Sequence, residues 1–316
     1  MKRIVLSALF LSMFALSCQT EKATADAAPL QNKRQGWNGA TLYGDVESVV
    51  VKSREDGNDS YTTRKYMFNQ RGDVYEVSTY NASGRLIPET IYRYDENGKM
   101  VEKQLHYEGA LCKRVLFRYD AEGNNTEVNE LDAHGKLLRK LNYIYVEGRI
   151  VKMIADIRIN NSRCEFPFAY DSRGNLIEGT EYATPLDDEF QSGFISHEYA
   201  YDLNGNVTKD EFEWDDNVEG AAVDVAYVYD DKGRKIKEKT IVDTGEPFWT
   251  VQIFKYDEAD RVIEVETFYS SNNELTKYTK FYKYDSMDNE IEVVESGRNG
   301  AKSEVVRNSQ ITYRRV

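Results

Sequence analysis

Two tryptophans and a group of aspartates, spread over three successive stretches of the chain, are the residues best suited to chemistry. An aromatic ring beside carboxylates suits a sugar, which stacks on the ring and donates hydrogen bonds to the acids. Carboxylate oxygens also suit Ca²⁺. We therefore expect a ligand site formed by six residues, Asp187, Asp188, Trp214, Asp215, Asp216 and Trp249. The alternative is a set of solvated turns with one packed tryptophan.

The three histidines, His106, His134 and His197, share no spacing, and no nucleophile, phosphate-binding or zinc motif accompanies them. We expect a non-catalytic protein that binds a glycan or a cell-surface protein. One alternative is a glycan-acting hydrolase, whose two carboxylates would lie about 5 to 9 Å apart. The other is a purely structural protein of the cell envelope.

The elements that position these residues come from one repeat. The string Y-D-x-x-G, or a close variant, begins nine units that follow one another at intervals of 25 to 31 residues. Asp at the first turn position accepts hydrogen bonds from the turn's own amides, and Gly at the fourth supplies a left-handed residue. Asp260 and Asp288 replace this glycine, and Asp tolerates that conformation better than most residues. The pattern predicts a tight hairpin turn in every unit.

Aromatic residues lie one and three positions before each turn, which puts both side chains on one face of a strand. We expect these residues to form two rows that are buried as a core ladder. The pairs are Tyr66/Phe68, Tyr92/Tyr94, Phe117/Tyr119, Tyr143/Tyr145, Phe168/Tyr170, Tyr199/Tyr201, Tyr227/Tyr229, Phe254/Tyr256 and Tyr282/Tyr284.

The fold class predicted from these units is all-β. Each unit supplies two antiparallel strands joined by the Asp turn at one edge and by a looser turn at the other, for about 18–20 strands in all. A sheet of more than about ten strands tends to curl. We therefore predict a long meander that coils on itself, with aromatic rows inward and charges outward. The long turns that carry the six candidate residues should lie side by side on one edge.

The Y-D-x-x-G units resemble the YD repeats of bacterial Rhs-type surface proteins, from Tyr66 to the C-terminus. In that family the repeats form a spiralling β-sheet, so the resemblance implies a surface-exposed β-scaffold. The array here is short, its second turn varies in length, and no toxin-like segment follows the last unit. The resemblance therefore does not imply encapsulation of a toxin.

The N-terminus is typical of an exported protein. Lys2 and Arg3 precede a short apolar run that ends at Cys18, which indicates a signal peptide over 1–17 and lipidation of Cys18. Ordinary signal-peptidase cleavage is the alternative. Residues 18–36 are polar and Ala-rich, as in a flexible tether, and 37–316 form one repeat domain. We expect a lipoprotein of the bacterial envelope, in the outer membrane and facing either the periplasm or the surface.

Composition narrows the partners further. The 316 residues include 54 acidic and 41 basic side chains, for a net charge of −13. Binding to nucleic acid needs clustered basic residues, so we expect no nucleic-acid partner, and contact with a membrane only through the lipid. We expect a monomer without a required cofactor. Cys112 and Cys164 lie two units apart with opposite strand parity, which predicts two free thiols.

Overall fold

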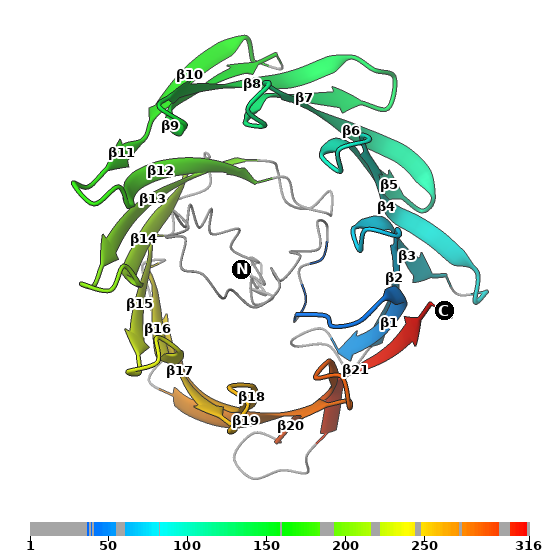
Figure 1. Cartoon of the computed structure of the whole chain (residues 1–316), viewed down its shortest axis with the longest axis vertical. Coiled ribbons are helices and arrows are strands. Elements are labelled where there is room, and N and C mark those ends of the chain that lie inside the picture. The colour runs from blue at the N-terminus through cyan, green and yellow to red at the C-terminus, as the bar shows by residue number, and fades with distance from the viewer. Residues whose placement is uncertain are drawn as a thin grey trace, which may run out of the picture. The chain divides into compact units, whose positions relative to one another are not determined.

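A computed structural model describes residues 37, 39, 41–54, 61–81, 83–158, 160–183, 193–215, 222–243, 248–271, 274–296 and 304–314. Within these residues 21 strands belong to one sheet, and most strands that follow one another pair antiparallel (Figure 1). The predicted all-β hairpin meander is confirmed. The described residues contain no helix that is long and apolar enough to cross a membrane.

The chain divides into two compact units. The first contains the described residues up to Arg114, with Lys283–Val293 and those from Val305; the second contains Val115–Tyr282 and Val294–Glu304. The strands up to the middle of the chain are β1 (Val46–Arg54), β2 (Tyr61–Phe68), β3 (Val74–Tyr80), β4 (Leu86–Tyr94), β5 (Met100–Tyr107), β6 (Ala110–Tyr119), β7 (Asn125–Asp132), β8 (Leu137–Val146), β9 (Arg149–Ile157) and β10 (Ser162–Pro167). The remaining strands are β11 (Ala169–Tyr170), β12 (Leu176–Ala183), β13 (Gly193–Tyr201), β14 (Val207–Asp215), β15 (Ala222–Tyr229), β16 (Lys235–Asp243), β17 (Phe248–Tyr256), β18 (Val262–Ser271), β19 (Glu274–Tyr284), β20 (Glu290–Glu295) and β21 (Glu304–Tyr313).

The repeated turns have the predicted geometry. In the turn between β4 and β5, the Gly98 amide donates to the Asp95 carbonyl at 3.1 Å. The Asp95 carboxylate accepts from the amides of Asn97 and Lys99 at 3.0 and 2.8 Å. Gly98 has φ +83°, and the two aspartates that replace this glycine, Asp260 and Asp288, have φ +61° and +65°. The sequence pattern therefore identified the left-handed residue of each turn correctly.

The tyrosine before the turn has a role that the pattern did not reveal. In the six repeats given next, its hydroxyl donates to a backbone carbonyl of the strand that follows the preceding turn. Within the first compact unit, Tyr94 donates to the Val74 carbonyl at 2.6 Å. Within the second unit Tyr145, Tyr170, Tyr201, Tyr229 and Tyr256 reach the carbonyls of Asn125, Ile150, Leu176, Val207 and Lys235 at 2.7 to 3.0 Å. Each of these bonds ties one repeat unit to the one before it.

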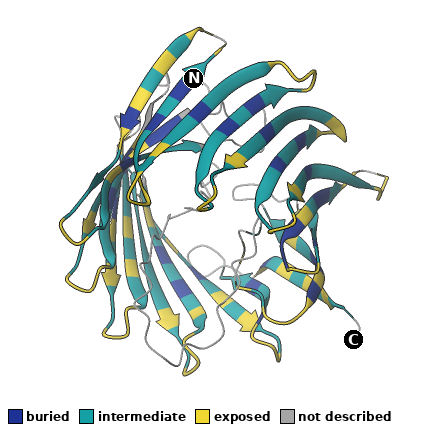
Figure 2. Cartoon of the chain, turned by 45° about the horizontal axis from the view of Figure 1, so that its top comes forward, coloured by how far each residue is buried: buried dark blue, intermediate teal, exposed yellow. Residues whose placement is uncertain are grey.

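The aromatic rows are less buried than predicted. Phe68 is 2% exposed, but the other seventeen register residues are half-buried. Figure 2 shows the buried residues as short bands within strands, with exposed residues gathered at the turns. Because a single sheet covers only one side of each ring, full burial would need a second layer. The expected core ladder is therefore only half-buried over most of its length.

The other face of the sheet carries ion pairs at a fixed spacing. The residue between the two register aromatics is a cation in four units, and a glutamate nine residues later lies opposite it on the next strand. Arg93 contacts Glu102 at 3.5 Å and Lys255 contacts Glu264 at 2.7 Å, and the other two pairs are Arg118–Glu127 and Lys283–Glu292. Where the first position is Ala200, its register partner is Lys209, so like charges do not meet.

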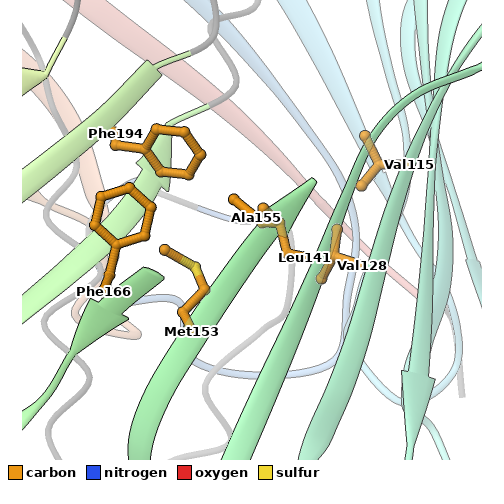
Figure 3. Close-up of a cluster of buried hydrophobic side chains, with 7 residues drawn as sticks. All are labelled: Val115, Val128, Leu141, Met153, Ala155, Phe166 and Phe194. Carbon is orange, nitrogen blue, oxygen red and sulfur yellow. The ribbon is translucent and has the colours of Figure 1, made fainter. Parts of the chain in front are cut away.

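The second unit has a local double layer. The two-residue strand β11 separates β10 from β12, and at this break the β12–β13 hairpin turns its other face toward the aromatic face of β7–β10. Phe194 packs on Phe166 with ring centroids 4.6 Å apart. These rings complete a buried cluster with Val115, Val128, Leu141, Met153 and Ala155 (Figure 3). This is the one place in the described part of the second unit where such a large apolar cluster is buried.

The first unit joins the two ends of the meander, because β1 pairs with both β2 and β21. Asn289, which is fully buried, accepts a hydrogen bond from the Tyr43 amide at 2.6 Å and donates to the Tyr43 carbonyl at 3.1 Å. It also donates to the Tyr313 hydroxyl at 2.7 Å. The last turn of the array thus holds residues that flank both terminal strands, and the predicted return of the sheet on itself is confirmed.

Removing one inter-unit hydroxyl tests its contribution to stability. Tyr201→Phe leaves the Leu176 carbonyl without its donor, so we expect the free energy of unfolding to fall by about 1 kcal/mol. Tyr199→Phe is the matched control, since this tyrosine lies two residues earlier on the same strand and makes no hydrogen bond within the described residues. Urea unfolding followed by circular dichroism measures both. Equal losses in the two variants would contradict the assigned role of the bond.

Candidate functional site

Six successive strands of the second compact unit end together at one edge of the sheet, on either side of segments 184–192, 216–221 and 244–247, which lie outside the described residues. These strands are β12 to β17. Their end pairs are Ala183–Gly193, Phe194–Asp215, Ala222–Asp243 and Val242–Phe248. The strand ends that flank these segments are therefore neighbours in the sheet, as the spacing of the repeat predicted.

The structure describes three of the six predicted ligand residues, Trp214, Asp215 and Trp249. Asp187, Asp188 and Asp216 lie outside the described residues, as does the predicted lipidation site Cys18. Trp214 and Asp215 are the last residues of β14, where Trp214 pairs with Ile195. Trp249 lies near the start of β17, pairs with Ile241 and Ser270, and is half-buried. Their role in binding stays a prediction.

More apolar surface lies at the same edge. The rings of Phe248 and Tyr269 are 5.9 Å apart at an angle of 46°. Tyr269 is 36% exposed and Leu275 is 61% exposed. Such partly exposed rings beside polar turns are typical of ligand surfaces.

A charged cluster lies on the aromatic face of the same hairpins. Strand alternation places Glu181 of β12, His197 and Tyr199 of β13, and Asp210 and Phe212 of β14 on this face, because Tyr199 pairs with Asp210 and His197 with Phe212. His197 Nδ1 is 2.9 Å from Asp210 Oδ1, and Nε2 is 3.8 Å from Glu181 Oε1. The His197 and Tyr199 rings are stacked, with centroids 5.4 Å apart. One imidazole is thus flanked by two carboxylates.

Burial and charge fix the protonation of this cluster. The side chains of His197 and Asp210 are 6% and 3% exposed, whereas that of Glu181 is 35% exposed. Burial opposes a charge on His197, but the hydrogen bond to Asp210 and the neighbouring Glu181 outweigh it and raise the pKa of His197 to about 9. Burial, with the charges of Asp210 and Glu181, raises the pKa of Tyr199. At neutral pH the cluster therefore holds an imidazolium and a neutral phenol.

The Nε2–H of His197 is a hydrogen-bond donor of this cluster. It is buried and makes no hydrogen bond within the described residues. A hydroxyl group matches this donor chemically, because a hydroxyl accepts from Nε2–H and donates to a carboxylate such as Glu181. A metal ion does not fit, since a protonated imidazole has no lone pair to offer. The described residues contain no group of three or more His, Cys, Asp or Glu that could hold a metal ion.

A second charged group fixes the double layer described above. The Tyr182 hydroxyl donates to Glu130, which is 4% exposed, and the Arg139 guanidinium lies 4.4 Å from the centre of the Tyr182 ring. Arg139 also lies over Phe194, at 5.3 Å. These contacts join β7 and β8 to the β12–β13 hairpin, so they support the strands that carry His197.

The sequence did not single out His197, because three histidines without a common spacing carried no pattern. A usable indication was parity. His197 precedes Tyr199 by two residues, and Asp210 precedes Phe212 by two, so both polar residues fall on the aromatic face. Cys112 and Cys164 are both free, as predicted.

Comparison with known proteins finds similarity in structure alone. No protein-family model matches the sequence, and no curated protein matches it. The chain is similar to one in the crystal structure of TcdB2-TccC3-Cdc42, at 13% identity and a TM-score of 0.42, over 81% of this chain and 15% of that one. A chain of the Photorhabdus luminescens Tc holotoxin pore matches at 12% identity and 0.40, over 78% of this chain and 15% of that one.

Two porin-like proteins are similar over nearly their whole length. The protein from Bacteroides vulgatus matches at 11% identity and a TM-score of 0.36, over 86% of this chain and 99% of that one. The protein from Bacteroides uniformis matches at 11% identity and 0.34, over 84% and 96%. By contrast, this chain spans about 15% of the length of the toxin chains.

The pKa of His197 makes a testable statement about stability. A histidine whose pKa rises from 6.5 to about 9 on folding stabilises the protein fully below its unfolded pKa, and this contribution is lost as pH rises through 9. The linked free energy is on the order of 3 kcal/mol. We expect the difference in unfolding free energy between wild type and His197→Gln to shrink by this order between pH 6.5 and 9.5. Urea titrations at both pH values measure the difference, and a constant difference would contradict the assigned pKa.

Proposed function

We propose that this protein is an exported, lipid-anchored scaffold of the bacterial envelope that binds a glycan at the long-turn edge of its second unit. The observation that carries the proposal is the common end of the hairpins from β12 to β17. It brings the strands bearing Trp214 and Trp249 to one edge of the sheet, with Trp249 on the face opposite to Phe212 and Phe248. A chain with nine repeated hairpins supplies a rigid support, and the irregular turns of such a scaffold are where ligands bind.

The register links this edge to the histidine cluster. Glu181 pairs with Ile195, and Ile195 pairs with Trp214, so the three residues form one row across three strands. At about 4.8 Å per strand, Glu181 and Trp214 are roughly 10 Å apart along this row. That distance is on the scale of a short oligosaccharide. A hydroxyl of a sugar stacked at the edge could therefore donate a hydrogen bond to Glu181, the most exposed carboxylate of the cluster.

Binding is favoured over hydrolysis by the state of the carboxylates. A glycosidase needs one carboxylic acid that gives up a proton and a second carboxylate nearby. Asp210 instead lies 2.9 Å from His197 Nδ1 and is 3% exposed, so it is engaged by the histidine and is not open to a substrate. This arrangement supports a site that holds a ligand without cleaving it.

A glycan array probed with the mature domain tests the binding proposal. We expect Trp214→Ala and Trp249→Ala to weaken binding at least tenfold, the usual loss at an aromatic hot spot of about 2 kcal/mol. Glu181→Gln should weaken it several-fold. Phe281→Ala is the control, because Phe281 is 42% exposed but lies near the opposite end of β19 from this edge. Binding that ignores both tryptophan substitutions would overturn the site, and release of shortened glycans would favour the hydrolase.

The anchor is tested separately. We expect the wild-type protein to incorporate a labelled fatty acid and to enter the detergent phase, because two or more acyl chains hold a protein firmly at a membrane. Cys18→Ala should abolish both. Incorporation of label into the Cys18→Ala variant, or none into wild type, would contradict lipidation at this cysteine.

A further inference from the structure

Lys103 breaks the charge pattern of the sheet. It lies in β5 of the first unit and pairs with the register aromatic Tyr92, so it belongs to the aromatic face. Its neighbour Glu102 points to the other face, where it contacts Arg93 and Arg114 at 3.5 and 2.6 Å. A lysine therefore stands where the alternation calls for an uncharged residue.

Lys103 lacks the partner that the comparable lysines have. Lys255, at the cation position of its own unit, contacts Glu264 at 2.7 Å and Glu266 at 3.7 Å. Over the whole described part of the chain, no carboxylate lies within ion-pair distance of Lys103, and no hydrogen bond reaches its amine. The residue is half-buried, and no carboxylate neutralises its amine.

The surroundings of this amine are apolar or cationic. Thr90 and Leu105, which pair with each other beside it, are 1% and 6% exposed. Lys113 from β6 adds a like charge, and Tyr92 from β4 is the titratable group opposite. Burial first, and then the charge of Lys113, lower the pKa of Lys103 to about 8. Burial raises the pKa of Tyr92 to about 12, so the phenol stays neutral.

We propose that Lys103 is a nucleophilic amine that captures an aldehyde- or ketone-bearing ligand as an imine. A lysine beside another cation, in a poorly solvated place, keeps a lone pair at neutral pH. Nζ attacks the carbonyl carbon and forms the C–N bond. The carbonyl oxygen then leaves as water with the two hydrogens of the amine, so no oxidant or reductant is required. This site is independent of the glycan edge in the second unit.

Limited labelling of the full mature protein with glycolaldehyde and sodium cyanoborohydride tests the proposal. Peptide mapping gives the rate at each lysine and separates them from any free α-amine. At pH 7.5 we expect Lys103 to react at least tenfold faster than Lys255, because a larger fraction of its amine is neutral. The rate at Lys103 should rise with pH to a midpoint near 8.

Two variants sharpen the test. Lys103→Arg should remove the fast-reacting peptide and leave the rates of the other lysines unchanged. Lys113→Met removes the neighbouring charge, so we expect the midpoint of Lys103 to rise and its rate at pH 7.5 to fall several-fold. Near-ultraviolet circular dichroism confirms that each variant is folded. A Lys103 that reacts no faster than Lys255 in the folded wild type would overturn the proposal.

Discussion

The tyrosine hydroxyl that reaches back to the preceding strand is the interaction on which the repeat depends. A hairpin alone buries little and is marginal in water, and a single sheet leaves its aromatic face half-covered. The Tyr201 hydroxyl donates to the Leu176 carbonyl at 2.7 Å, and this bond joins one repeat to the repeat before it. It explains why the position before the turn is tyrosine in every unit but the first, where Phe68 has no preceding unit to join. The position two residues earlier accepts phenylalanine or tyrosine, since no such bond is required there.

Much of the fold follows from local rules that the sequence displays. The turn of Asp95 and Gly98, the parity of Tyr92 and Tyr94, and the succession of antiparallel hairpins all depend on residues within one unit. The nine-residue spacing of Arg93 and Glu102 could have been read in the same way. What local rules do not contain is the break at β11. There Phe194, on the parity opposite to Tyr199, enters a core, because the hairpin packs on strands from a different part of the sheet.

The candidate site divides along the same line. The edge that bears Trp214 and Trp249 was predictable because turn length is a property of each unit. The cluster of Glu181, His197 and Asp210 was not, because its contacts run diagonally across three strands and depend on the register of each pair. A two-residue period places each side chain on a face, but only the register decides which of them meet. Contacts between buried charges are therefore the hardest feature of such a sheet to predict from the sequence.

Departures from the repeat are informative according to whether the structure compensates them. Asp260 stands where glycine is expected and takes a left-handed conformation. Its carboxylate forms ion pairs with two residues of the preceding turn, Lys232 at 3.0 Å and Arg234 at 2.5 Å. Its role is explained by stability alone. Lys103 has no comparable ion pair, so its amine on the aromatic face loses hydration and gains no counter-charge. Such uncompensated departures from the local rules are expected at functional sites, which supports placing the proposed reactive amine at Lys103 and not among the paired lysines.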